Sequence, residues 1–232
     1  MYAFATNLSS LFWRLGEEMP GAREDRHKFD FDGGTVSLDF VNTVSGMRGG
    51  NDPRDRILTY PDLVYWAAQI GLIDSRQAAD LYGRAEREPG RAAQAHVEAI
   101  RRREALHDVV VAAVGERPPP AAALGTVNGW VAEAMAKRRF RMAAPGKFEA
   151  SLEDDGDLLA FLRPVALDAA ELLEDEVSQG LVGVCEERLV GRCAWLFLDT
   201  SRNHSRRFCN MDECGNRAKQ RRHYQRRKHS QP

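Results

Sequence analysis

The chain has 232 residues, of which 43% are hydrophobic and 29% are charged, and this composition is typical of a globular protein with a real hydrophobic core. No apolar run approaches the roughly 18–20 residues that a membrane span needs. The first residues lack the basic, apolar and small-residue regions of a signal peptide, so we expect a cytoplasmic protein.

The net charge of −1 conceals an uneven distribution. Residues 201–232 contain eight Arg and two Lys but only one Asp and one Glu, a local balance of +8, so the preceding 200 residues sum to −9. A basic tail on an acidic body predicts a polyanionic partner for the tail. From charge alone, the alternative is a solvated, disordered tail.

The sequence divides into three predicted regions. Residues 1–28 are expected to be an N-terminal extension, either disordered or not native, because Met19-Pro20 offers an alternative start. Residues 29–180 are expected to form a mostly helical domain, and residues 181–232 a zinc finger with a basic helix.

The segment at residues 37–43 places three polar side chains among apolar ones: Asp39, Asn42 and Thr43. On a helix, Asp39 shares a face with Asn42 or Thr43, which fits either of two interpretations. One is a small-ligand pocket, which could serve an enzyme. The other is a buried polar network that fixes the start of a helix, and it is the interpretation we favour.

Helices are predicted at 61–71, 74–86, 91–114, 121–138 and 164–174 from Pro and Gly punctuation and apolar spacing. Asp74 and Gln77 resemble a capping box for the second of them. The fourth carries an apolar stripe of Leu124, Val127, Val131 and Met135.

Short strands are predicted at 28–31, 140–143, 147–152 and 158–161. The fold class is therefore mainly α with a small β element in the N-terminal domain. Residues 1–180 contain no nucleophile elbow, phosphate loop or dinucleotide fingerprint, so the sequence does not predict an enzyme.

The cysteines give the strongest pattern. The chain has four, and all fall between positions 185 and 214: Cys185, Cys193, Cys209 and Cys214. In a cytosolic protein such a cluster favours metal binding over disulfides, and two short-spaced pairs suit the tetrahedral preference of zinc. We therefore predict one Zn²⁺ per chain. His204 is the alternative ligand if Cys185, in the wider pair, does not bind.

The residues between and after the two pairs predict a treble-clef-like finger. Residues 194–198 are strand-like, 200–205 are polar and turn-like, and 206–208 are expected to return as the second strand of a hairpin. After Cys214, the run from Arg217 is rich in good helix formers. This arrangement puts the last ligand at the start of a helix.

Basic side chains on the hairpin and helix form the expected nucleic-acid surface. They are Arg202, Arg206, Arg207, Arg217, Lys219, Arg221, Arg222 and Arg226. Like charges four residues apart repel on an isolated helix, and nucleic-acid phosphate is the usual counter-charge that relieves them. The alternative for Arg206 or Arg217 is an internal role, in which the side chain holds Asp199 or a ligand sulfur.

The C-terminal run from Cys193 to Arg227 resembles the CGNR zinc finger, named for Cys214-Gly215-Asn216-Arg217. The segments FDFDGGTVSLDFVNTV and ILTYPDLVYWAAQIGLI resemble the ABATE domain that precedes this finger in bacterial proteins. Together the resemblances cover about residues 29–229. They imply a helical N-terminal domain, zinc bound by the four cysteines, and a regulator of transcription linked to stress.

Three hypotheses therefore stand. The first is a DNA-binding transcription regulator whose N-terminal domain senses a small-molecule effector or mediates assembly, with a homodimer as an expected partner arrangement. The second is an RNA-binding protein that uses the same basic surface, since phosphate contacts are shared between RNA and DNA. The third is an enzyme with a site near Asp39 and Asn42.

Overall fold

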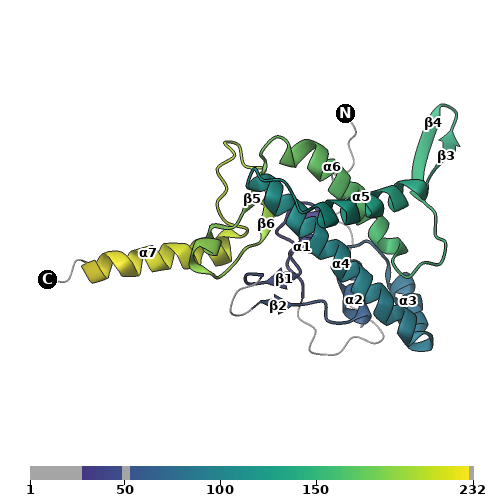
Figure 1. The fold of residues 1–232 in the computed structure, drawn as a ribbon, viewed down its shortest axis with the longest axis horizontal. Coiled ribbons are helices and arrows are strands. Elements are labelled where there is room, and N and C mark those ends of the chain that lie inside the picture. The colour runs from purple at the N-terminus through teal and green to yellow at the C-terminus, as the bar shows by residue number, and fades with distance from the viewer. Residues whose placement is uncertain (1–27, 49–52, 230–232) are drawn as a thin grey trace.

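The computed structural model describes residues 28–48 and 53–229, and it is mostly helical (Figure 1). The predictions about an N-terminal extension and about Met19 as a start lie outside the described residues. The helices are α1 (Val36–Val41), α2 (Tyr60–Gln69), α3 (Ser75–Arg87), α4 (Pro89–Val114), α5 (Ala121–Ala136), α6 (Arg163–Leu172) and α7 (Asn216–His229). No helix among the described residues is both long and apolar enough to span a bilayer.

The strands form three antiparallel pairs, so the predicted class of a mainly α protein with a small β element is confirmed. The strands are β1 (Val44–Ser45), β2 (Arg54–Asp55), β3 (Arg138–Ala144), β4 (Lys147–Leu152), β5 (Val182–Val184) and β6 (Leu196–Leu198). β1 pairs with β2, β3 with β4, and β5 with β6.

Capping boxes begin two of the helices. Thr59 and Asp62 exchange side-chain-to-backbone hydrogen bonds at the start of α2. Asp74 and Gln77 do the same for α3, as the sequence predicts. Each pair satisfies backbone N–H groups that a helix start otherwise leaves unpaired.

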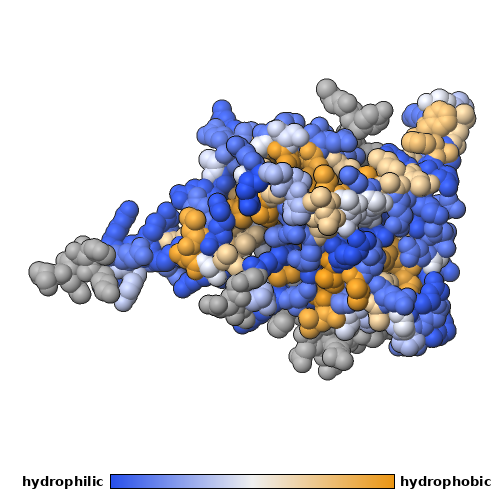
Figure 2. Space-filling view, in the orientation of Figure 1, coloured by the Kyte–Doolittle hydropathy of each residue, from blue (hydrophilic) through white to orange (hydrophobic). Residues whose placement is uncertain are grey.

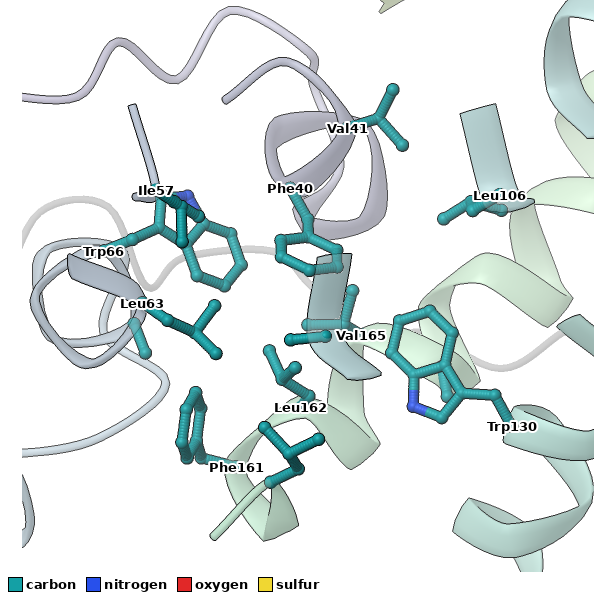
Figure 3. Packing of buried hydrophobic residues seen from close by; sticks show 14 of the residues in the cluster. Phe40, Val41, Ile57, Leu63, Trp66, Leu106, Trp130, Phe161, Leu162 and Val165 are labelled. Carbon is teal, nitrogen blue, oxygen red and sulfur yellow. The ribbon is translucent and has the colours of Figure 1, made fainter. Parts of the chain in front are cut away.

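The core of the helical domain lies where α1, α2, α4, α5 and α6 meet (Figure 3). Phe40 of α1 is fully enclosed and contacts two tryptophans, with ring centroids 5.0 Å from Trp66 and 6.2 Å from Trp130. Leu162, from the turn that leads into α6, and Val165, from α6 itself, complete the packing. Aromatic side chains bury large areas, so this cluster supplies much of the stability of the domain.

The buried face of α5 differs from the predicted stripe. The residues that face the core are Ala123, Val127, Trp130 and Ala134, whereas Leu124 and Met135 are 38% and 48% exposed. The reason is Trp130, which has the largest side chain on the helix. Burial of its indole fixes the orientation of α5, and in this orientation Ala123 and Ala134 also face the core.

Two of the predicted strands do not form. Residues 158–161 make a turn and the start of a 3-10 helix, Ala160–Leu162, that leads into α6. Leu158, Leu159, Phe161 and Leu162 are all buried, which is the spacing of a helical turn and not the alternation of a half-buried strand. Residues 28–31 are extended, but they pair with no strand among the described residues.

Candidate metal centre and nucleic-acid interface

The four cysteines converge from three short segments. Cys185 follows β5, and Cys193 precedes β6. Cys209 precedes the π-helical turn Met211–Gly215 that leads into α7, and Cys214 lies within that turn. All four are buried, and their sulfurs lie within 4.8 Å of one another. His204 is exposed, and its Nδ1 pairs with the Asp199 carbonyl at 3.1 Å, so it is not part of the cluster.

The spacing of the sulfurs fits a tetrahedral zinc site. Cys193 Sγ lies 3.7 Å from Cys209 Sγ, which lies 3.6 Å from Cys214 Sγ. Four sulfurs at about 2.3 Å from one zinc ion are separated by about 3.8 Å in a tetrahedron. No disulfide joins them, since all four are free thiols. The donor set is therefore that of a closed, structural zinc site and not of a redox pair.

Small residues permit the close packing around the sulfurs. A side chain at Gly183 would place its Cβ 2.6 Å from the Phe197 ring, so β5 and β6 can pair here only with glycine at this position. Gly191 ends the turn before Cys193 with a φ of +71°, a conformation that costs other residues about 1 kcal/mol or more. Asn210 accepts hydrogen bonds from two backbone N–H groups at the start of the last turn.

β6 does not pair with the residues that the sequence predicts. Its partner is β5, which lies before the first cysteine, and residues 206–208 form no strand. The prediction of a hairpin across 194–208 is therefore wrong. The polar turn at residues 200–205 is held instead by the Asp199 side chain, which accepts from the backbone N–H groups of Ser201 and Arg206.

Arg206 has an internal role, in contrast to the predicted role in nucleic-acid binding. Its guanidinium donates to the carbonyl oxygens of Leu198 and Phe208, each at 3.0 Å, and also to those of Asp32 and Cys209. It also lies 4.6 Å from the centroid of the Phe197 ring. These contacts occupy the planar donor fork, so this side chain joins the finger to the helical domain.

Arg221 is also held by the protein. It donates to both carboxylate oxygens of Glu187, at 2.7 and 3.1 Å, and Glu187 is fully buried. The hydrogen bond to Glu187 raises the pKa of Arg221. Because a buried carboxylate needs a counter-charge, this pair fixes α7 against the turn that follows Cys185.

Two further arginines contact the surroundings of the metal centre. Arg217 donates to Cys214 Sγ at 3.1 Å, and this hydrogen bond raises the pKa of Arg217. Such a contact offsets the negative charge of a thiolate ligand. Arg207 is exposed but pairs with Glu186 through two hydrogen bonds of 2.5 Å.

The remaining basic residues of the predicted surface face solvent. Arg202, Lys219, Arg222 and Arg226 are all exposed. The helix that carries three of them, α7, extends away from the body of the molecule (Figure 1), and its surface is hydrophilic on the face seen in Figure 2. Ala218 is its only buried residue among those whose side chains are described.

Asp39, Asn42 and Thr43 lie on or next to α1, and all three are buried. Asn42 Nδ2 donates to the Leu196 carbonyl at 2.8 Å, and its Oδ1 accepts from the Leu196 N–H at 2.9 Å. The Thr43 hydroxyl donates to the Phe40 carbonyl at 2.8 Å. These bonds account for the side chains as a structural network.

Asp39 accepts a hydrogen bond from the Gly33 N–H at 2.8 Å. Burial raises the pKa of Asp39 to about 7, against the opposing effect of that hydrogen bond, and the nearby charges of Asp32 and Asp168 raise it further. A Cβ at Gly33 would lie 2.8 Å from the Asp39 carboxylate, so the glycine is required for this close approach.

The sequence does not predict how firmly the finger is docked on the helical domain. Leu198 N–H donates to the Gly33 carbonyl at 2.7 Å, and Ala194 N–H donates to that of Gly46 at 3.1 Å. The Trp195 indole N–H donates to the Val44 carbonyl at 2.8 Å. Apolar and polar residues follow no regular alternation in residues 32–46. The high content of apolar residues is therefore the only signal in the sequence that this segment is buried.

The geometry defines a class of protein: a helical domain with a docked, four-cysteine zinc finger that ends in a projecting basic helix. Comparison with known families agrees. Residues 34–176 match the ABATE family, described as "Putative stress-induced transcription regulator", and residues 182–227 match the CGNR zinc finger. The first match covers more than half of the chain, so the protein belongs to the ABATE family. No curated protein matches the chain.

The finger match and the cysteine cluster together show that the protein binds one zinc ion. The match to the first family ends at residue 176, and the match to the second begins at residue 182. Both families are of regulator or zinc-finger type, and neither is an enzyme family. The family description assigns a regulatory role.

Proposed function

We propose that the protein is a DNA-binding regulator of transcription that contacts DNA through α7. The observation that carries this proposal is the projection of α7 from the body with basic side chains exposed along it. A helix that is polar on all sides gains little from packing on its own protein. Its repeated positive charge therefore favours a polyanion as its partner.

The contact set that we propose is narrower than the set of basic residues in the finger. It consists of Arg202, Lys219, Arg222 and Arg226. The major groove of B-DNA admits one α-helix, and a helix that stands clear of its domain can enter it without a clash between the body and the backbone. Arg206 and Arg221 act instead to hold the finger and to aim α7.

In this proposal the ABATE domain senses a small-molecule effector or mediates assembly, and the finger transmits the outcome to DNA. The docking of β6 along residues 33–46 supports such a coupling, because a change in α1 would reach the zinc centre through Asn42 and Leu196. A rigid element shared by two sites is the physical requirement for coupling between them.

The test is binding of labelled duplex DNA, measured by fluorescence anisotropy across a salt series. Reversal of Lys219 and Arg222 to Glu should weaken binding by about tenfold or more and reduce the salt slope, because phosphate contacts are lost. The matched control is the double reversal of Arg76 and Arg87 to Glu, both exposed on α3, which changes the charge equally at a distance from α7. Equal loss in the two double variants would refute α7 as the contact.

Binding of structured RNA distinguishes this proposal from the alternative, an RNA-binding protein. Tighter binding of structured RNA than of duplex DNA, at the same salt concentration and with the same dependence on Lys219 and Arg222, would overturn the assignment to DNA in favour of an RNA-binding protein. Tighter binding of duplex DNA supports the regulator.

A further inference from the structure

The β3–β4 hairpin is an element that leaves the ABATE domain and stands clear of its core, at the end of the molecule opposite α7 (Figure 1). Within the described residues, β3 and β4 pair with each other and with no other strand. Nearly every residue of the two strands is exposed. An isolated pair of strands is marginally stable in water, and further strands or a packed face are the usual remedy.

One face of this hairpin is apolar. Phe140 lies opposite Ala150, and Met142 lies opposite Phe148, so the four side chains share a face. Phe140, Met142 and Phe148 are 68%, 63% and 66% exposed, and the hairpin shows as an apolar projection in Figure 2. Large apolar side chains gathered in this way on a projecting element mark an interaction surface.

The opposite face is already satisfied. Arg139 pairs with Glu153 at 2.6 Å, and Arg141 pairs with Glu149 at 2.5 Å. These ion pairs suit contact with water. A partner is therefore expected at the apolar face or at a strand edge, where residues of the charged face can take part only at the ends of the paired strands.

In the part of the chain that the structure describes, no strand pairs with the outer edge of β4. The Glu153 N–H donates to the Lys137 carbonyl, so this position bonds inward to β3. Inward and outward positions alternate in an antiparallel pair. Hence the N–H and carbonyl groups of Phe148, Ala150 and Leu152 point outward, where another strand can bind them.

Charge decides between the two edges for contact with a second copy. Pairing of β3 with itself about Phe140 would set Arg139 opposite Arg141, and β3 is also interrupted by a bulge between Met142 and Ala144. Like charges opposite each other destabilise a sheet, and bulges block edge pairing.

Pairing of β4 with itself about Ala150 has the opposite character. It sets Lys147 opposite Glu153 and Phe148 opposite Leu152, so opposite charges and apolar groups meet. The outward-pointing main-chain groups of Ala150 then face their own symmetry mates, as a hydrogen-bonded pair requires.

We propose that the protein forms a two-fold symmetric dimer in which β4 pairs antiparallel with β4 of a second copy, with Ala150 at the axis. The four-stranded sheet supplies the neighbouring strands that each hairpin lacks. It also joins the two apolar faces into one. Because α7 lies at the other end of the molecule, the two fingers point away from the interface and remain free to bind.

Site-specific crosslinking tests this register. Ala150→Cys places two thiols next to each other across the axis, whereas Ala144→Cys, also exposed and at the hairpin tip, places them far apart. The four native thiols lie in the metal centre. With zinc bound, a short bis-maleimide should convert A150C into covalent dimer and leave A144C monomeric. Equal crosslinking of the two variants would overturn the register.

A charge exchange tests the interface itself. By sedimentation, Lys147→Glu alone and Glu153→Lys alone should each weaken dimerisation by about tenfold, and the double variant should restore it. The Arg139–Glu153 pair within one chain remains broken in the double variant, so recovery there can come only from contact between copies. A wild-type protein that stays monomeric at micromolar concentration, or a double variant no better than the single ones, would overturn the proposal. DNA binding by a monomer would leave the proposed function intact.

Discussion

The helical domain and the finger are held together by different forces. In the helical domain, residues such as Phe40, Trp66 and Leu106 are fully buried in one continuous apolar cluster. The finger has a much smaller cluster, in which the four cysteines are packed with a few aromatic rings and Ala218. Small domains rarely bury enough apolar surface to fold without a metal or a crosslink. We therefore expect the finger to depend on zinc for its fold, whereas the helical domain has an apolar core of its own.

Removal of zinc should give the largest effect. Chelation is expected to unfold residues 185–227 while α2 to α6 keep their structure, because structural zinc contributes about 10–16 kcal/mol to the folding of small fingers. Hydrogen exchange resolved by peptide measures this directly. Protection should fall in the finger alone and return when zinc is added back. Uniform loss of protection in both regions would contradict the comparison.

The second-largest effect should come from loss of the ion pair between Arg221 and the buried Glu187. Arg221→Ala leaves the Glu187 carboxylate buried without a partner, and we expect a loss of about 2–3 kcal/mol in finger stability, less than for a fully buried pair because Arg221 is partly exposed. Arg222→Ala, one residue on and exposed, is the control and should change stability by about 0.5 kcal/mol or less. Denaturant unfolding of the zinc-bound protein compares them, and equal effects would count against the buried pair.

The hydrogen bonds between Asn42 and Leu196, which join the two regions, should contribute somewhat less to stability. Asn42→Ala leaves the N–H and carbonyl of Leu196 unpaired in a buried place, so we expect a loss of about 2 kcal/mol. Exposed Asn128→Ala on α5 serves as the control. Hydrogen exchange of β6 should rise in Asn42→Ala and stay unchanged in Asn128→Ala. An unchanged β6 in both variants would show that this side chain does not dock the finger.

A pH effect should be confined to the range between about pH 4 and pH 7 and should arise at Asp39. Because the pKa of Asp39 is raised to about 7, the folded protein retains a proton that the unfolded chain has lost above about pH 4. The free energy of unfolding should therefore fall as pH rises from about 4 to about 7. In Asp39→Asn this part of the decline should disappear, with Gly33 still able to donate to the amide oxygen. Parallel pH profiles for the two proteins would refute the buried carboxyl as the cause.

The sequence predicts the helices and the zinc cluster well because both rest on local or strongly specific patterns. Capping at Asp74 and four clustered cysteines need no knowledge of the tertiary fold. The partner of β6 could not be predicted in this way, since β5 lies on the other side of Cys185 and pairing across that distance depends on the docked domain.

The basic residues show the same limit more sharply. Arg206 and Arg222 are alike in the sequence, yet the first bonds four carbonyl oxygens and the second is exposed. A pattern of charge predicts a basic surface but cannot tell a contact residue from a structural one. Similarly, the role of Asn42 depends on the position of Leu196, with which it exchanges two hydrogen bonds across the fold.

The dependence of DNA binding on the zinc centre is tested most directly by metal content per chain, measured together with DNA affinity before and after chelation. We expect one zinc ion per chain, an affinity for duplex DNA that is lost on chelation, and recovery of that affinity when zinc is restored. A protein without zinc, or one whose DNA affinity survives removal of the metal, would contradict the claim that the zinc centre holds α7 in position to bind.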